Sequence, residues 1–304
     1  MPLDPKRSPQ ALIEAARTGH LVPLIGAGVS RHAKTRESYP FPGWGELIGD
    51  LTASAEGSWD ITPEDGEEIR CLIAQGKHLM AAQILKFKVG DVQLQNYLKR
   101  RFAPEDAEPG PIHMRLFDLQ PPVVLTTNYD TLLEQAYYLH YGRAPFVKTF
   151  AGAAEVEKRL KSHRQWTDPP AIFKLHGSID TPREIIFTEK DYRHLRYRAP
   201  GYRTVLSAIF VTKVLLMLGF SLADPELMLL IESLGDSLEA QKHPDYVVLP
   251  AGRKGRLERR RLKDDFGLEV IEYEPTSEND HREVFELVDY LVSFVPVNAG
   301  AVGV

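Results

Sequence analysis

Four short polar segments in this sequence each follow directly after an apolar run. They are Gly26-Ala27-Gly28-Val29-Ser30, Thr127-Asn128-Tyr129-Asp130, His176-Gly177-Ser178, and Gly219-Phe220-Ser221 with Asp224 close behind. The apolar runs themselves contain almost no polar side chains. In open α/β sheets, ligands bind beyond the carboxyl ends of the strands. If the apolar runs are strands of one sheet, these segments converge on a single site.

His176 is the residue in this set best suited to proton transfer. It follows the apolar run 171–175, and Gly177 leaves room beside its ring. An unperturbed imidazole has a pKa of about 6.5, which suits a general base near neutral pH. A lone buried histidine is more often a hydrogen-bonded core residue, so the placement at a strand end is what singles out His176. The remaining histidines lack that placement and are interpreted as surface or core residues.

Asn128 and Asp130 stand on either side of a predicted helix start. The amide of Asn128 can both donate and accept hydrogen bonds, so it can orient a water molecule or a sugar hydroxyl. Asp130 can cap the helix or place a negative charge beside the site. The sequence leaves these two interpretations of Asp130 open.

Gly26 and Gly28 lie where the first apolar run turns into a helix. Glycine at such a turn lets a phosphate approach the backbone N–H groups at the helix N-terminus. The third glycine of the dinucleotide pattern G-x-G-x-x-G is missing here. A plain tight turn therefore explains the pair equally well.

The order of elements predicts an α/β fold, because short apolar runs alternate with helical periodicity. Strands are expected at 21–25, 122–127, 145–149, 171–175, 184–187, 213–220, 246–249 and 268–273. Continuous apolar runs are typical of strands buried on both faces of a parallel sheet. We predict a Rossmann-like, doubly wound, mostly parallel sheet in a single domain spanning 1–304. A helical insertion is expected at about 44–119, and a further helix is expected to run to about 238.

Two basic clusters could bind anions. One is the run from Arg253 to Lys263, and the other comprises Tyr192, Arg193, Arg196, Tyr197 and Arg198. We interpret the first as a solvated helix with Leu257 and Leu262 facing the core, because the total charge is acidic. The second could line a pocket or an interface.

The composition of the chain excludes several kinds of structural site. The chain has 304 residues, 43% of them hydrophobic, a net charge of -5 and one cysteine, Cys71. One thiol excludes an intrachain disulfide framework and zinc sites built on several cysteines. The sequence shows neither a leader-like apolar segment nor an apolar run near the ~20 residues of a membrane span. These features predict a cytoplasmic protein without membrane contact, and direct binding to nucleic acid is not expected.

The ordered motifs resemble those of the sirtuin superfamily, and more closely the sirtuin-like domains of bacterial anti-phage defence systems. The matching segments are T-T-N-Y-D at 126–130, K-L-H-G-S at 174–178 and G-F-S-x-x-D at 219–224, together with the glycine loop. The resemblance covers the chain from about 21 to 273. It implies NAD as the substrate and cleavage of the nicotinamide–ribose bond.

Carried over to this sequence, the resemblance assigns roles to individual residues. His176 would be the catalytic base, with Asn128 and Asp130 beside the nicotinamide ribose and carboxamide. The nucleotide-binding residues would be Gly26, Ala27, Gly28, Ser30, Thr127, Gly219, Ser221 and Asp224. Of these, Gly26, Ala27, Gly28 and Ser30 would hold the pyrophosphate and ribose. Gly219 and Ser221 would contact the adenosine side.

The chain departs from protein-deacylating sirtuins at two points. It lacks the four-cysteine zinc module, and Tyr39 to Trp44 stands where those enzymes carry a Phe-Arg pair. Without the module, the groove for an acyl-lysine peptide is in doubt and water becomes the acceptor. We therefore expect an NAD glycohydrolase without a metal, acting as the effector of a defence system.

Other functions stay open on the sequence alone. They are a protein deacylase or ADP-ribosyltransferase, a non-catalytic sensor of NAD or ADP-ribose, and a nucleic-acid-binding subunit. The resemblance also implies a homo-oligomer and a separate sensor or activator, such as a translocase ATPase or an Argonaute-type protein.

Overall fold

The computed structural model describes residues 4–34, 41–222, 228, 231, 244–276 and 281–296. Asp224 and most of the helix predicted to run to about 238 lie outside these residues. In the described part of the chain, no helix is both long enough and apolar enough to span a membrane.

A seven-stranded sheet forms the centre of the molecule, with the strands in the order β3-β4-β2-β1-β5-β6-β7. All neighbouring strands pair in parallel. The strands are β1 (Leu21–Ile25), β2 (Val123–Thr126), β3 (Phe146–Thr149), β4 (Ala171–Lys174), β5 (Val214–Leu218), β6 (Asp245–Pro250) and β7 (Leu268–Tyr273). The predicted α/β class with a doubly wound, parallel sheet is confirmed.

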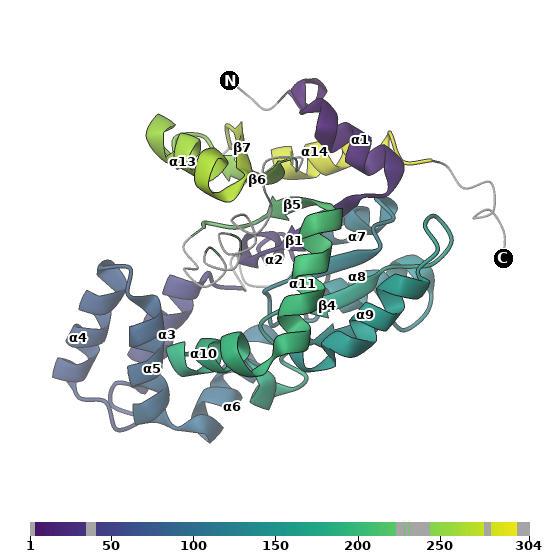
Figure 1. The fold of residues 1–304 in the computed structure, drawn as a ribbon. Coiled ribbons are helices and arrows are strands. Elements are labelled where there is room, and N and C mark those ends of the chain that lie inside the picture. Colours follow the sequence, from purple (N-terminus) through teal and green to yellow (C-terminus); the bar gives the residue numbers. More distant parts are fainter. Residues whose placement is uncertain are drawn as a thin grey trace.

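Helices cover both faces of this sheet (Figure 1). One face carries α1 (Gln10–Thr18), α7 (Pro111–Asp118), α8 (Leu132–Tyr141) and α14 (Arg282–Val292). The other carries α9 (Ala153–Ser162), α10 (Glu189–Arg198), α11 (Pro200–Thr212) and α13 (Arg256–Phe266). The short elements are η1 (Pro5–Arg7), α2 (Ala27–Ser30), η2 (Phe150–Gly152) and η3 (Pro182–Glu184).

The central strands are apolar throughout because each of their faces meets a helical layer. In β5, Leu216 and Leu218 belong to the core beneath α1 and α14, whereas Leu215 and Met217 belong to the core beneath α11. Successive side chains of a strand point to opposite faces, so a strand covered on both sides reads as one continuous apolar run.

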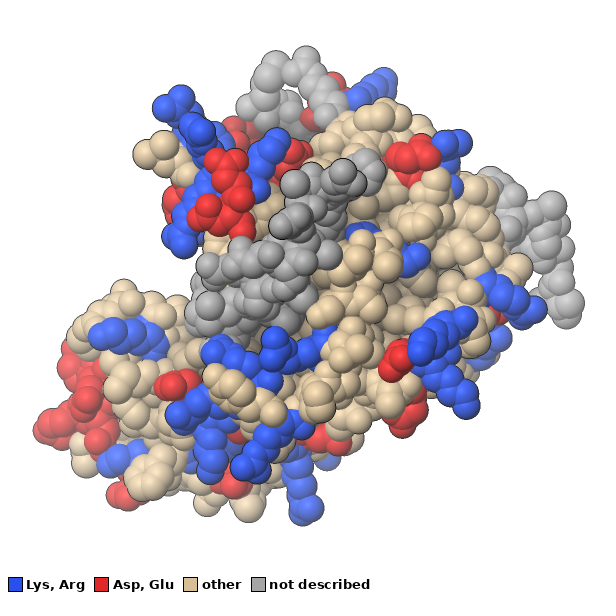
Figure 2. Space-filling view, viewed as in Figure 1, with Lys and Arg blue, Asp and Glu red and all other residues tan. Residues whose placement is uncertain are grey.

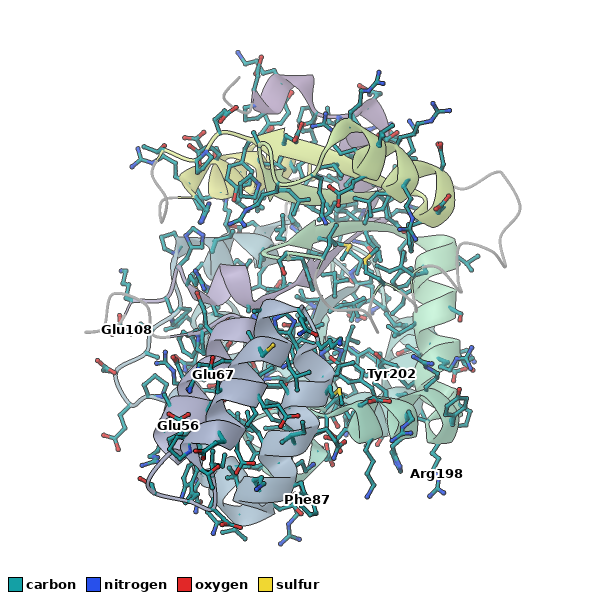
Figure 3. The ribbon with its side chains drawn as sticks, turned by 90° about the vertical axis from the view of Figure 1, so that its left-hand side faces the viewer. Glu56, Glu67, Phe87, Glu108, Arg198 and Tyr202 are labelled. Carbon is teal, nitrogen blue, oxygen red and sulfur yellow. The ribbon has the colours of Figure 1, made fainter. Side chains whose placement is uncertain are left out.

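The chain between β1 and β2 is helical, as the periodicity predicts. It forms α3 (Trp44–Ala55), α4 (Pro63–Ala74), α5 (His78–Val89), α6 (Asp91–Phe102) and then α7. The first four of these helices gather beside the sheet around their own apolar core, which includes Leu51, Ile69 and Leu85 (Figure 1). Phe87 is 84% exposed and lies at the outer end of this module (Figure 3). Helix α7 returns to the sheet and packs against α8 and α14.

Two expectations about local structure are wrong, and one helix was not predicted. Residues 184–187 form no strand, since η3 ends at Glu184 and the segment after it adds no ladder to the sheet. Helix α9 is an element without a matching prediction. Leu257 is 74% exposed instead of facing the core, although Leu262 is buried as expected.

Candidate functional site

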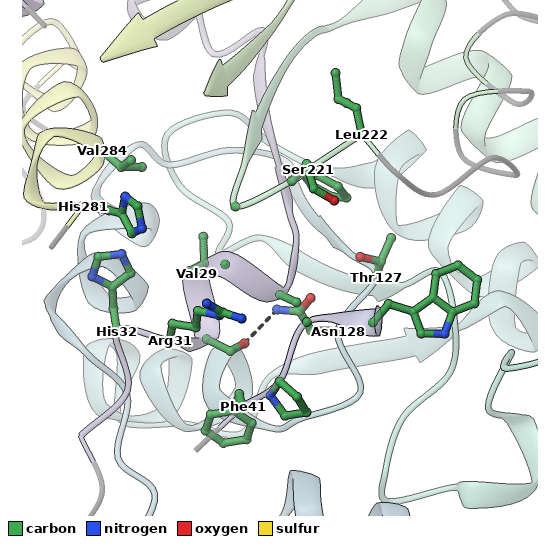
Figure 4. Close-up of a pocket in the computed structure, with 18 of the residues that line it drawn as sticks. Val29, Arg31, His32, Phe41, Thr127, Asn128, Ser221, Leu222, His281 and Val284 are labelled. Atoms are coloured by element: carbon green, nitrogen blue, oxygen red, sulfur yellow. Dashed lines mark hydrogen bonds between the residues drawn. The ribbon is translucent and has the colours of Figure 1, made fainter. Parts of the chain in front are cut away.

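A cavity of about 460 Å³ opens along the carboxyl edge of the sheet (Figure 4). Its walls come from the segments that follow β1, β2, β4 and β5, from the ends of β6 and β7, and from the start of α3. Pockets of a few hundred Å³ with a few convergent polar groups are typical of small-molecule sites. The polar segments of the sequence thus meet in one place.

The cavity lies at the topological switch point, where the order of the strands reverses on the two sides of β1. From β1 the chain proceeds to β2 on one side, whereas β5 pairs with β1 on the other side. The loops after β1 and β5 touch here, because the Gly28 N–H donates to the Gly219 carbonyl over 2.9 Å. A Cβ atom at Gly28 would lie 2.8 Å from the Cα of Gly219, so this contact requires glycine. The Gly26 N–H is also used inside the protein, where it donates to the carbonyl of Leu218.

A chain of hydrogen bonds joins the ends of β1 and β2. The Asn128 Nδ2 donates to the Gly26 carbonyl over 3.0 Å. It also donates to the Ser30 Oγ over 2.8 Å, the bond drawn as a dashed line in Figure 4. Because a carbonyl can only accept, these contacts fix the orientation of the amide and turn its oxygen away from them. The Ser30 hydroxyl in turn donates to the Asp130 Oδ2 over 2.7 Å.

Asp130 is a buried carboxylate that is 4% exposed. Its Oδ1 accepts the N–H of Leu132 at the start of α8, and its Oδ2 accepts the Ser30 hydroxyl. The N-cap position of α8 is Thr131, so Asp130 is not the cap residue itself, but its carboxylate accepts the first N–H of the helix and also lines the cavity.

His176 is buried at the cavity wall and is oriented by an aromatic neighbour. The hydroxyl of Tyr192 lies 3.3 Å from its Nδ1, and the two rings meet edge to face at 5.1 Å. Gly177 has a φ of 87°, and a Cβ atom there would lie 2.3 Å from the Glu184 carbonyl oxygen. Glycine is required because the chain turns sharply to bring 184–186 back over His176, whose carbonyl accepts the N–H of Ile186.

A buried lysine supports the turn that carries Asn128 and Asp130. The Lys174 side chain is 0% exposed, and its Nζ donates to the carbonyls of Tyr129 and Asp130 and to the Glu134 Oε1 at 2.7 Å. Burial raises the pKa of Glu134 despite the opposing effect of Lys174. Lys174 thus ties the end of β4 to the β2–α8 turn.

Comparisons with known proteins find sirtuin-like relatives of this chain. A family described as the SIR2-like domain matches residues 122–271. The chain is 25% identical to "Defense-associated sirtuin 2" of Bacillus subtilis over 72% of this chain and 20% of that protein. It is 27% identical to "NAD(+) hydrolase ThsA" of Acinetobacter baumannii over 74% of this chain and 41% of that protein. A protein of the same name from Enterococcus faecium is 25% identical over 83% of this chain and 46% of that protein.

Residues 122–271 match the SIR2-like domain. The chain spans between a fifth and about half of the length of these relatives. The matched segment contains the ends of β2, β4, β5 and β6, which contribute to the walls of the cavity described above.

The structure brings together the residues predicted for the sirtuin-like site. The cavity is lined by Ala27, Gly28, Ser30, Thr127, Asn128, Asp130, His176, Gly219 and Ser221. Gly26 lies just behind this wall and accepts the bond from Asn128. Asp224 lies outside the described residues. Within those residues, no cluster of three histidine, cysteine or acidic side chains could hold a metal ion.

Three further side chains around this site, Trp44, His113 and Lys174, received no individual role from the sequence. Trp44 lines the cavity, and its ring centroid lies 6.1 Å from that of Tyr192 with the two planes tilted by 39°. Its Nε1 is buried without a hydrogen-bond partner in the described structure. His113 is buried near Asp130, and burial lowers its pKa to about 4. Lys174 carried the clearest signal, because it is a lysine within an otherwise apolar strand.

The two basic clusters have different surroundings (Figure 2). On α13, blue and red side chains intermingle, because its arginines and lysines pair with carboxylates such as Asp264, Asp265 and Glu272. The ion pairs agree with the interpretation of α13 as a solvated helix.

The second basic cluster lies on α10. There Tyr192 faces the cavity, whereas Tyr197 is 72% exposed.

Proposed function

We propose that this chain is an NAD glycohydrolase that releases nicotinamide and ADP-ribose, acting as an effector of anti-phage defence. The observation that carries the proposal is the convergence of His176, Asn128 and Asp130 on one cavity at the switch point of a sirtuin-like sheet. The names of the relatives, a defense-associated sirtuin and NAD(+) hydrolases, support it.

In the proposed reaction, the bond between the nicotinamide nitrogen and the ribose C1′ breaks first. Nicotinamide departs as a neutral ring, so it needs little acid assistance, and positive charge develops on the ribose. A water molecule then forms the new bond to C1′ and gives its proton to His176. The edge-to-face contact and the hydroxyl of Tyr192 hold the imidazole in place for this step.

Asn128 orients the water or the ribose hydroxyls through its amide oxygen. Both hydrogen bonds of the amide nitrogen are made inside the protein, so the oxygen is held in a fixed direction. Asp130 supplies a preorganised negative charge near the developing cation. Ser30 gives its only hydroxyl hydrogen to Asp130, and we assign it the task of joining these two side chains.

The rest of the dinucleotide would lie along the strand ends. Ala27, Gly28 and Thr127 line the cavity and would contact the ribose and pyrophosphate. Gly219 and Ser221 also line it and would contact the adenosine side. The N–H groups of Gly26 and Gly28 are already bonded, so these glycines act through close packing of the loops and not as phosphate donors.

We further propose that NAD is consumed in the cytoplasm, that the chain forms a homo-oligomer, and that a separate sensor or activator controls it. A translocase ATPase or an Argonaute-type protein fits the resemblance.

An NAD-consumption assay with product identification tests the proposal. The protein is incubated with NAD alone, with an acylated peptide, and with the products of its neighbouring genes. Nicotinamide and ADP-ribose formed without a peptide support the proposal. Release that depends on the acylated peptide would indicate a deacylase instead, and binding without any product under all conditions would indicate a sensor.

A further inference from the structure

The cavity extends well beyond the proposed reaction centre. His176 follows β4, and the strands β4, β2, β1, β5 and β6 are consecutive neighbours in the sheet. Neighbouring strands are about 4.8 Å apart, so the end of β6 lies about 19 Å from the end of β4. A dinucleotide whose reacting ribose lies beside His176 can therefore extend its adenosine half to the ends of β6 and β7.

The wall at that far end is cationic. Arg253 and Lys254, in the turn between β6 and α13, line the cavity together with Tyr273, His281 and His32. Figure 4 shows His32 and His281 on the side of the cavity opposite Thr127. Among the lining residues that the structure describes, Asp130 is the only carboxylate, and it belongs to the other end.

Arg253 is the principal charge at this end. Lys254 lies 3.3 Å from the carboxylate of Glu258, which partly neutralises it. No acidic side chain within the described ranges forms an ion pair with Arg253. Both Arg253 and Tyr273 line this end of the cavity. Burial and the carboxylate of Glu283 raise the pKa of the Tyr273 hydroxyl to about 12, and the charge of Arg253 opposes this rise.

We propose that this end of the cavity binds a phosphate on the adenosine ribose, so that the site takes NADP as a substrate in addition to NAD. The inference rests on the proposed function, because it assumes the same orientation of the dinucleotide. In dinucleotide sites a carboxylate recognises the ribose 2′-hydroxyl, whereas an arginine accommodates the 2′-phosphate. Guanidinium is suited to this task because it can donate two parallel hydrogen bonds to phosphate oxygens.

Kinetics on the two dinucleotides test the proposal. We expect Arg253→Ala to lower the ratio of kcat/KM for NADP to that for NAD by about tenfold or more, because a charge-assisted hydrogen bond to phosphate is lost. Arg256→Ala is the matched control, since it removes the same charge nearby from a residue that does not line the cavity. The control should leave the ratio unchanged. An unchanged ratio in Arg253→Ala would overturn the proposal.

A binding measurement separates this proposal from the proposed function. Calorimetry compares ADP-ribose with ADP-ribose 2′-phosphate on the full chain, which needs no turnover. Tighter binding of the 2′-phosphate that is lost in Arg253→Ala supports the phosphate site even if neither dinucleotide is cleaved. Equal affinity for the two compounds, or a preference that Arg253→Ala retains, contradicts it whether or not NAD is hydrolysed.

Discussion

Replacing Lys174 with methionine should destabilise the fold and displace the turn that carries Asn128 and Asp130. Methionine preserves much of the volume of the side chain but removes its charge. The substitution leaves the carboxylate of Glu134 without its cation, and the Oε2 of this carboxylate already has no hydrogen-bond partner in the described structure. Breaking a buried ion pair by removing one partner costs about 3–5 kcal/mol.

The cost should depend on Glu134 and on pH. We expect Glu134→Gln to cost less than Lys174→Met, because Lys174 keeps the carbonyls of Tyr129 and Asp130 as acceptors. The double variant Lys174→Met/Glu134→Gln should lose less free energy of unfolding than the two single variants lose together. We expect the difference to be about 2 kcal/mol or more. In Lys174→Met, the folded-state pKa of Glu134 rises further above its unfolded value. Above that raised pKa, the buried unpaired carboxylate lowers the free energy of unfolding by its full amount. As the pH falls through the raised pKa, Glu134 becomes protonated and this loss of stability is relieved.

Urea unfolding of the four proteins in this cycle, at about pH 7.5 and about pH 5, measures both effects. Strictly additive free energies would refute the assignment of Lys174 and Glu134 as a coupled pair. A loss in Lys174→Met that is equal at both pH values would show that an unpaired carboxylate is not its cause.

Further predictions concern the surroundings of His176 and the core. Gly177→Ala should lower the free energy of unfolding well beyond the cost of Gly142→Ala, because both positions have a positive φ but only the first meets a backbone atom; the control should cost about 1–2 kcal/mol. Burial depresses the pKa of His113 from 6.5 to about 4, so its contribution to stability is full above about pH 6.5 and is lost as the pH falls toward 4. Over this window the free energy of unfolding should fall by about 3 kcal/mol because of His113. Urea unfolding at several pH values should show that the free energy of unfolding of His113→Gln depends less steeply on pH than that of the wild type. Tyr192→Phe should slow NAD cleavage about fivefold to tenfold with unchanged urea unfolding, since it removes one hydrogen bond to His176; an unchanged cleavage rate contradicts this role.

Much of the fold could be predicted because its elements carry strong local patterns. The helical insertion expected at about 44–119 is present as α3 to α7, and the strands of the sheet carry apolar runs. Helix α9 was missed because only Ala153 and Val156 of its residues are buried, so its periodicity is faint. Leu257 was placed wrongly because it precedes the buried Leu262 by five residues, which turns it about 140° around the helix.

The site could be predicted in outline but not in its bonding. The rule that ligands bind at the carboxyl ends of parallel strands brought the polar segments together. It could not show that Ser30 bridges Asn128 and Asp130, because those partners are about a hundred residues away along the chain. Nor could it show that the loop glycines serve a contact between β1 and β5, which exists only once the sheet is assembled.

The rate of nicotinamide release from NAD by the wild-type chain, His176→Ala and Asn128→Ala, measured together with any activating partner, tests the central claim most directly. Thermal unfolding of each variant serves as the control for folding. We predict that the wild-type chain releases nicotinamide and ADP-ribose, and that both variants stay folded without turnover. Undiminished release by the two folded variants would contradict the assignment of this cavity as the site of NAD hydrolysis.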